Sequence, residues 1–249
     1  MDTLVYERKI KIPNHEVDFT GHWRIASIFN EMQEISEQHG KMLGVSRKKL
    51  DDCGIFWVIS RMRVHMQAYP TWGEEIISAT WPHNIGSRIF PRCFRFTRLN
   101  GELLGQATTI YLLMDMKTQQ ITRAPEGIVI PDVKHADEPP ALGLGKLITD
   151  QDMEEAGRRK PRYSDIDMNN HMNNERYAQW ICDMFEPGRF RENYIETLQI
   201  NFLAEARPNE SITLFLHEEQ ENAWISGKRE DSGTPVFEAL CAWSGRQTR

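Results

Sequence analysis

The chain has 249 residues, of which 40% are hydrophobic and 27% are charged, and its formal net charge is −6. This length suits one large domain or two small ones, and the composition can bury a core, which excludes a disordered tail. The acidic balance argues against a general nucleic-acid binder, because contacts to phosphates need a basic surface.

Targeting and metal-binding signals are sparse. No run of about 18 or more apolar residues occurs, so no membrane span is expected, and the start "MDTLVYERKIKIPN" has no apolar signal core. The four cysteines are scattered without a CxxC pair, and the histidines are dispersed. This spacing predicts no metal site, no disulfide framework and no cofactor. A reducing, cytoplasmic location is expected.

The first half reads as one helix followed by strands. Apolar residues recur at three- and four-residue steps from Ile25 to His39, which predicts a helix. Thr20 or Gly21 is expected to cap its start, and Gly40 or Gly44 its end. Four stretches then show strand patterns, the last two joined by an Asn-Gly hairpin turn. They cover residues 54–70, 74–81, 87–99 and 103–116.

A proline- and glycine-rich stretch follows, and the same order of elements then returns. We predict a linker over 126–160 with a short helix over 149–158, between an N-terminal unit (1–125) and a C-terminal unit (161–249). A helical stripe runs from Tyr177 to Phe185. The strands expected after it cover residues 196–206, 210–219, 222–230 and 236–245.

The two halves can be laid over each other. Asp18 and His22 bracket three residues, as do Asp167 and His171, with the same offset of 149. Two further pairs, Pro70 with Pro208 and Gly101 with Gly233, align at shorter offsets. These matches predict an α+β fold of two tandem hotdog repeats, each a long helix wrapped by a curved antiparallel sheet. Pairing of the two sheet edges would give one continuous sheet.

The motifs resemble those of the acyl-acyl carrier protein (acyl-ACP) thioesterase family over nearly the whole chain. Its central signature, D-x-D-x-N-x-H-x-N-N-x-x-Y, matches "DIDMNNHMNNERY" from Asp165 to Tyr177. "AYPTWG", "ITRAP" and "INFLAEARPNESI" add support from both halves. Many plant members carry a Glu-Cys pair where this chain has Glu205-Ala206, so a thiol nucleophile is not expected there.

The resemblance implies a catalytic set of Asp167, Asn169, His171 and Glu205. Glu205 or Asp167 would act as base or nucleophile, and this choice stays open. His171 would hold or polarise the attacking group, Asn169 would orient water or the carbonyl, and backbone N–H groups near His171 and Met172 would stabilise the oxyanion. Taken without the resemblance, the asparagine run reads as a helix cap and turn. Asp18 and His22 are interpreted as a duplicated relic.

The resemblance further implies hydrolysis of fatty acyl-ACP thioesters, with acyl-ACP as the partner and the acyl pocket in the first half. Phe56, Val58 and the strand over 109–114 are candidates for its lining. The alternatives are an acyl-coenzyme A thioesterase, a non-catalytic acyl-binding module and a hotdog dehydratase. An acidic carrier would need a basic patch, for which 158–162 ranks above 46–49 and the arginines from Arg88 to Arg98. A homodimer stays open.

Overall fold

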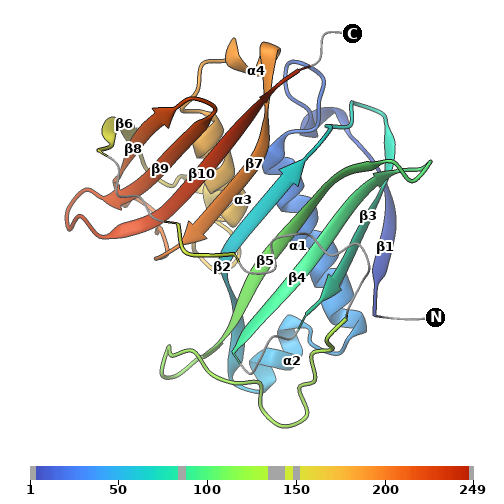
Figure 1. The fold of residues 1–249 in the computed structure, drawn as a ribbon. Helices are drawn as coiled ribbons and strands as arrows, with labels where there is room; N and C mark the ends of the chain where they lie inside the picture. Colours follow the sequence, from blue (N-terminus) through green and yellow to red (C-terminus); the bar gives the residue numbers. More distant parts are fainter. Residues whose placement is uncertain (1–3, 84–87, 134–143, 148–151, 247–249) are drawn as a thin grey trace.

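The computed structural model describes residues 4–83, 88–133, 144–147 and 152–246 (Figure 1). They form a 10-stranded sheet in the order β1-β3-β4-β5-β2-β7-β10-β9-β8-β6. The N-terminal half contributes β1 (Tyr6–Lys11), α1 (Ile25–Met42), α2 (Arg47–Asp52), β2 (Ile55–Met66), β3 (Glu75–Pro82), β4 (Ile89–Arg98) and β5 (Leu103–Asp115). The C-terminal half contributes β6 (Glu154–Arg159), α3 (Asn174–Cys182), α4 (Arg189–Glu192), β7 (Asn193–Phe202), β8 (Ile212–Glu219), β9 (Asn222–Arg229) and β10 (Pro235–Gly245).

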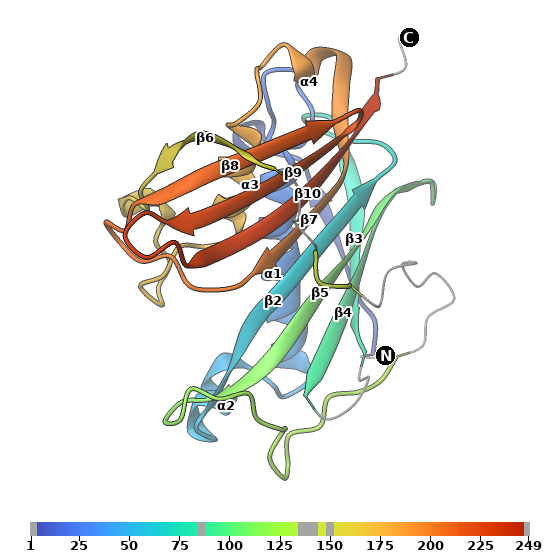
Figure 2. The same ribbon diagram turned by 60° about the vertical axis from the view of Figure 1, so that its left-hand side comes forward.

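The two halves join through β2 and β7, which pair antiparallel from Arg61–His65 to Thr197–Asn201. The strand order on one side of this seam repeats on the other, so the predicted double hotdog with a continuous sheet is confirmed. Figure 2 shows the strands of the second half turned relative to those of the first, and Figures 1 and 2 place α1 and α3 on the same side of the sheet. One core holds both helices, including Phe29, Met32 and Tyr177.

Helix α1 carries its buried residues on the predicted stripe, from Ile25 through Met32 to His39. Its start differs from the expectation, because Arg24 is the N-cap residue and no side chain caps the helix. At the other end Gly44 has a φ of +73° just after the C-cap residue, which is the usual place of glycine at a helix end. Gly40 lies inside the helix.

The sequence pattern misses strands β1 and β6, which lie at the two edges of the sheet. β1 alternates charged with half-buried residues and pairs with β3. β6 is almost fully exposed and pairs with β8. The short helix expected over 149–158 is wrong for the described part, since 154–158 belong to β6, inside the segment expected as linker. An exposed edge strand carries little apolar periodicity, so it is recognised only in the structure, from its pairing with the neighbouring strand.

No helix among the described residues is long and apolar enough to cross a membrane.

Candidate active site

The loop before α3 is organised by the carboxylate of Asp167. Its Oδ1 accepts hydrogen bonds from the backbone N–H of Asn169 (2.8 Å) and of His171 (3.3 Å), and its Oδ2 accepts one from Asn169 Nδ2 (3.0 Å). The backbone N–H of Asp167 donates to the carbonyl of His171 (2.9 Å). Asn170 takes the left-handed conformation that this turn requires, with a φ of +63°. Asp167 therefore holds the loop that carries His171.

His171 and Glu205 form the second part of the site. His171 Nε2 lies 3.0 Å from Glu205 Oε2, and the two side chains are 35% and 50% exposed. Glu205 lies three residues beyond the end of β7 at Phe202, so it belongs to the following loop and not, as expected, to the strand. The backbone N–H of Met172 donates to the carbonyl of Ala206 (3.0 Å), which fixes the two loops against each other.

Tyr177 supports the Glu205 loop from below. Its hydroxyl accepts a hydrogen bond from the backbone N–H of Ala206 (3.2 Å). Its ring packs edge-on against Phe202 and Phe237. Burial raises the pKa of Tyr177 to about 12, so the phenol stays protonated at neutral pH. Tyr177 is thus a rigid support, in agreement with its fixed position in the motif.

The asparagines have separate structural tasks. Asn173 is the N-cap residue of α3, and its Oδ1 accepts from the backbone N–H of Glu175 (3.0 Å) and from Gln33 Nε2 of α1 (3.1 Å). The cap interpretation is therefore correct for Asn173. The backbone N–H groups of His171 and Met172 already donate within the protein, so the geometry does not support them as oxyanion donors.

The first half contains a loop with the same hydrogen bonds as the Asp167–His171 loop, but without a counterpart of Glu205. Asp18 Oδ1 accepts from the backbone N–H of Thr20 (2.8 Å) and of His22 (3.3 Å). The backbone N–H of Trp23 donates to the carbonyl of Pro70 (2.9 Å), in the same way that Met172 donates to Ala206. Pro70 thus corresponds to Ala206, and the sequence alignment of Pro70 with Pro208 is wrong by two residues.

It follows that Tyr69 occupies the place of Glu205 in the first copy. Tyr69 is half-buried, and its hydroxyl donates to the carbonyl of Ile195 (2.7 Å). Burial and the nearby Arg246 lower the pKa of His22. The first loop therefore keeps the hydrogen-bond frame of the second but has Tyr69 where the second has Glu205, which supports its interpretation as a relic.

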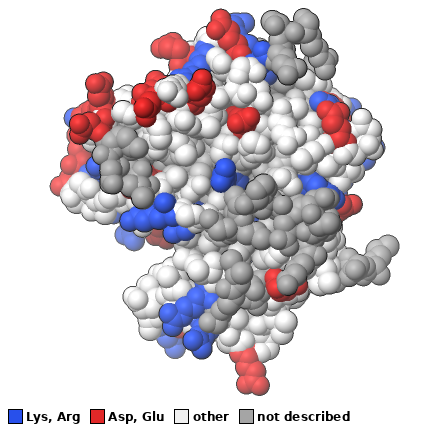
Figure 3. All heavy atoms as spheres, in the orientation of Figure 1, with Lys and Arg blue, Asp and Glu red and all other residues white. Residues whose placement is uncertain are grey.

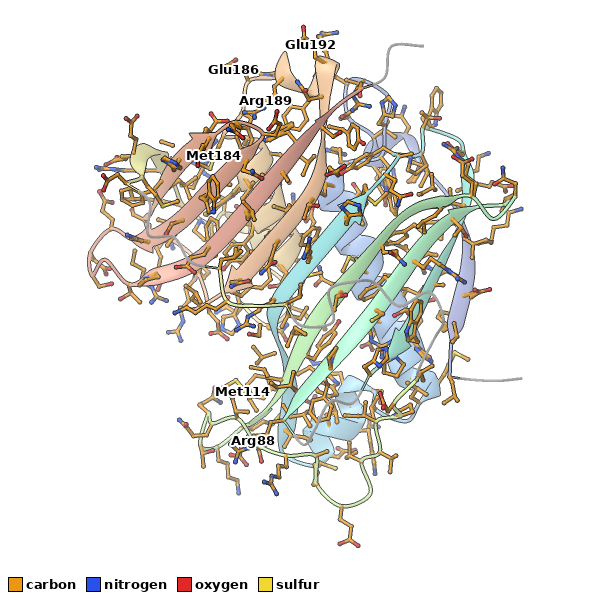
Figure 4. The ribbon with its side chains drawn as sticks, viewed as in Figure 1. Arg88, Met114, Met184, Glu186, Arg189 and Glu192 are labelled. Carbon is orange, nitrogen blue, oxygen red and sulfur yellow. The ribbon has the colours of Figure 1, made fainter. Side chains whose placement is uncertain are left out.

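A cavity of about 1730 Å³ is lined by residues of the second loop and of the first half. Asp167, Asn169, His171 and Glu205 all line it, so the structure brings the four predicted site residues to one cavity. Figure 4 shows one of its other lining residues, Met114, at the lower end of β5. The expected lining of Phe56, Val58 and, from 109–114, Tyr111 and Met114 is present, and the lining also includes Trp57 and Phe90.

Some arginines of the predicted basic patches are engaged in ion pairs within the protein. Arg95 pairs with Glu7, Arg98 pairs with Glu74, and Arg158 pairs with both Glu155 and Glu230. In Figure 3 acidic side chains gather over the upper left of the molecule, whereas Lys and Arg form separate groups over the lower part. Among the described residues, no group of three or more His, Cys, Asp or Glu side chains is placed to hold a metal ion.

Solved structures share this fold. An acyl-ACP thioesterase from Bacteroides thetaiotaomicron VPI-5482 superposes with a TM-score of 0.89 at 20% identity, covering 98% of this chain and 100% of that one. The 12:0-ACP thioesterase from Umbellularia californica gives 0.80 at 22% identity, covering 98% of each chain. At these identities the likeness establishes the fold alone.

Sequence comparisons identify the family. A palmitoyl-acyl carrier protein thioesterase of Cuphea hookeriana is 28% identical over 201 residues, which is 75% of this chain and 48% of the relative. The chain spans about half the length of the curated relatives it matches. Family models match residues 3–131 (acyl-ACP thioesterase N-terminal domain) and 148–241 (acyl-ACP thioesterase C-terminal domain). The chain therefore belongs to the acyl-ACP thioesterase family.

Proposed function

We propose that this chain hydrolyses fatty acyl-ACP thioesters and releases the free fatty acid and the carrier. The observation that carries the proposal is the single cavity that joins the His171–Glu205 pair to apolar side chains of β2 and β5. A thioesterase of acyl chains needs this combination, because the chain requires a dry enclosure and the thioester requires an acid–base group at its mouth. The family and its acyl-ACP hydrolases agree with it.

In the proposed reaction Glu205 is the base. Its carboxylate reaches the cavity and faces His171, whereas three hydrogen bonds within the loop occupy the carboxylate of Asp167. Glu205 takes a proton from water as the oxygen attacks the thioester carbonyl, and collapse of the tetrahedral intermediate breaks the C–S bond. The sulfur leaves as the carrier thiol with that proton. His171 holds Glu205 in place, and Asn169 Oδ1 orients the water.

Release of free thiol from acyl-ACP substrates of graded chain length tests the proposal, beside the matching coenzyme A esters. We expect turnover of the carrier form and a loss of about 10²–10⁴-fold in His171→Ala. His22→Ala is the matched control, since it removes the corresponding histidine of the first loop, and it should retain activity. The lack of turnover on either thioester, with acyl binding unchanged by His171→Ala, would instead establish an acyl-binding module.

An acyl-coenzyme A preference is the alternative within the same chemistry. Adenine nucleotide should compete with a coenzyme A ester but not with acyl-ACP, because only the former carries the nucleotide. We also propose a cytoplasmic location, which agrees with the free thiols of Cys53, Cys182 and Cys241. A homodimer stays a prediction, which light scattering of the purified chain would check.

A further inference from the structure

The inner part of the cavity contains a buried positive charge. Arg92 of β4 is only 8% exposed, yet it lines the cavity. Its Nη1 donates to His39 Nδ1 (2.9 Å) and to Thr80 Oγ1 (3.3 Å). Among the described residues, its hydrogen bonds reach no carboxylate. Burial lowers the pKa of Arg92. A buried cation with neutral partners is costly to maintain, so its position at a cavity wall requires an explanation.

Two hydroxyl groups accompany Arg92. Tyr111 lies on the neighbouring strand β5, where its partner Phe90 is two residues from Arg92. The hydroxyl of Tyr111 lies near the side chain of Ser36 on α1, whose Oγ donates to the carbonyl of Met32 (2.6 Å), and burial raises the pKa of Tyr111. All three polar side chains line the cavity. We name Ser36, Arg92 and Tyr111 the distal polar cluster.

The cluster lies deeper along α1 than the active-site loop does. Gln33 contacts the N-cap residue Asn173, which places this turn of α1 beside the loop. Ser36 and His39, which meet Tyr111 and Arg92, follow three and six residues later. At 1.5 Å per residue this is a separation of about 5–9 Å along the helix. An extended acyl chain of medium length spans that interval.

We propose that the distal polar cluster binds an oxygen substituent on the acyl chain, remote from the thioester. The inference rests on the proposed function, since it assumes an acyl chain in the cavity. The bonds to His39 and Thr80 use Nη1 of Arg92, so Nε and Nη2 are the donors that it can direct at a ligand. That edge of a guanidinium matches acceptor oxygens, above all the two oxygens of a carboxylate. An unsubstituted chain would leave these donors without an acceptor on the ligand.

Calorimetric titration with free fatty acids tests the inference without requiring turnover. The probes are unsubstituted acids and their ω-hydroxy and ω-carboxy analogues over a series of medium chain lengths. We expect the oxygenated acids to bind roughly tenfold or more tightly at one length. A larger gain for the ω-carboxy acid would identify a carboxylate as the group recognised, and a gain for the ω-hydroxy acid alone would identify a hydroxyl.

Variants separate recognition from folding. Arg92→Met should abolish the preference for oxygenated acids, and Tyr111→Phe should weaken it. Arg95→Met, on the same strand but paired with Glu7 at the surface, should leave it unchanged. If Arg92→Met does not fold, Tyr111→Phe still decides. Equal affinities at every chain length, or a preference that survives in a folded Arg92→Met, would overturn the inference. Hydrolysis without this preference refutes the cluster alone, whereas the preference without hydrolysis refutes only the proposed reaction.

Discussion

Asp167 and Glu205 are both carboxylates at the mouth of one cavity, but their surroundings differ. The oxygens of Asp167 accept three hydrogen bonds from its own loop, while Glu205 is half exposed and faces His171. The repeat in the first half strengthens this distinction, because Asp18 makes the same backbone contacts in a loop where Tyr69 replaces Glu205. The aspartate present in both loops, Asp18 or Asp167, stabilises the loop. Glu205, which has no counterpart in the first half, serves the proposed chemistry.

Isosteric amides at the two positions should therefore behave differently. Glu205→Gln removes the proposed base and should lower kcat by about 10²–10⁴-fold while the melting temperature stays unchanged. Asp167→Asn keeps an acceptor oxygen for the N–H groups of the loop and should retain far more activity. Thiol-release kinetics and thermal melting measure both quantities. An Asp167→Asn variant as inactive as Glu205→Gln, and equally stable, would assign the base to Asp167 instead.

The thiols of Cys53 and Cys182 should differ in reactivity because their surroundings differ. Burial raises the pKa of Cys182 to about 12, so it has almost no thiolate at neutral pH, whereas Cys53 is exposed. We expect iodoacetamide to label Cys53 in the native protein and to leave Cys182 unmodified until the chain is denatured. Peptide mass spectrometry reads out both sites. Rapid native labelling of Cys182, whose side chain is partly exposed, would contradict the raised pKa of its thiol.

At the scale of elements, apolar periodicity predicted α1 and the inner strands well, because their faces pack against one core. The pattern could not reveal β1 and β6, whose residues are largely exposed and are held by pairing at the sheet edges. The family resemblance named four site residues, and all four line one cavity. It could not show that Glu205 lies beyond its strand, since the end of β7 depends on where β10 stops pairing, at Phe237 with Phe202.

The turn at Asn170 offers a test of the duplicated loop. Its φ of +63° corresponds to the φ of +81° at Gly21 in the first copy. Asn170→Gly should be nearly neutral for stability, whereas Asn170→Val should cost about 1–2 kcal/mol, because a β-branched residue resists the left-handed conformation. Chemical denaturation measures the free energy of unfolding. Equal stability of the valine variant would mean that the loop adopts another conformation in solution.

For the whole molecule, the seam between β2 and β7 explains why two repeats occur together. Each half alone would expose the backbone of one of these strands along its seam, which is a ready site for pairing with another chain. Separating the two halves would also remove the hydrogen bond from Gln33 to Asn173. The duplication thus satisfies an edge that neither repeat can satisfy by itself.

A fragment covering residues 1–131 should therefore not remain a folded monomer. We expect it to dimerise through β2 or to aggregate, as measured by size-exclusion chromatography with light scattering, while the full chain gives no such β2-mediated species. A fragment carrying a proline in β2, at Val64, is the control, because proline blocks the strand's pairing. A stable, monomeric fragment with native circular dichroism would show that the seam is dispensable.

The replacement of Glu205 by Tyr69 in the first copy also predicts how many acyl ligands one chain binds. Tyr69 cannot act as a base at neutral pH, and the described cavity is lined by residues of the second loop. If the proposed reaction holds, the two repeats share one acyl site, so each polypeptide should bind a single equivalent of a tight acyl ligand, whatever its assembly state. The repeat would then double the scaffold while the proposed catalytic site remains one per chain.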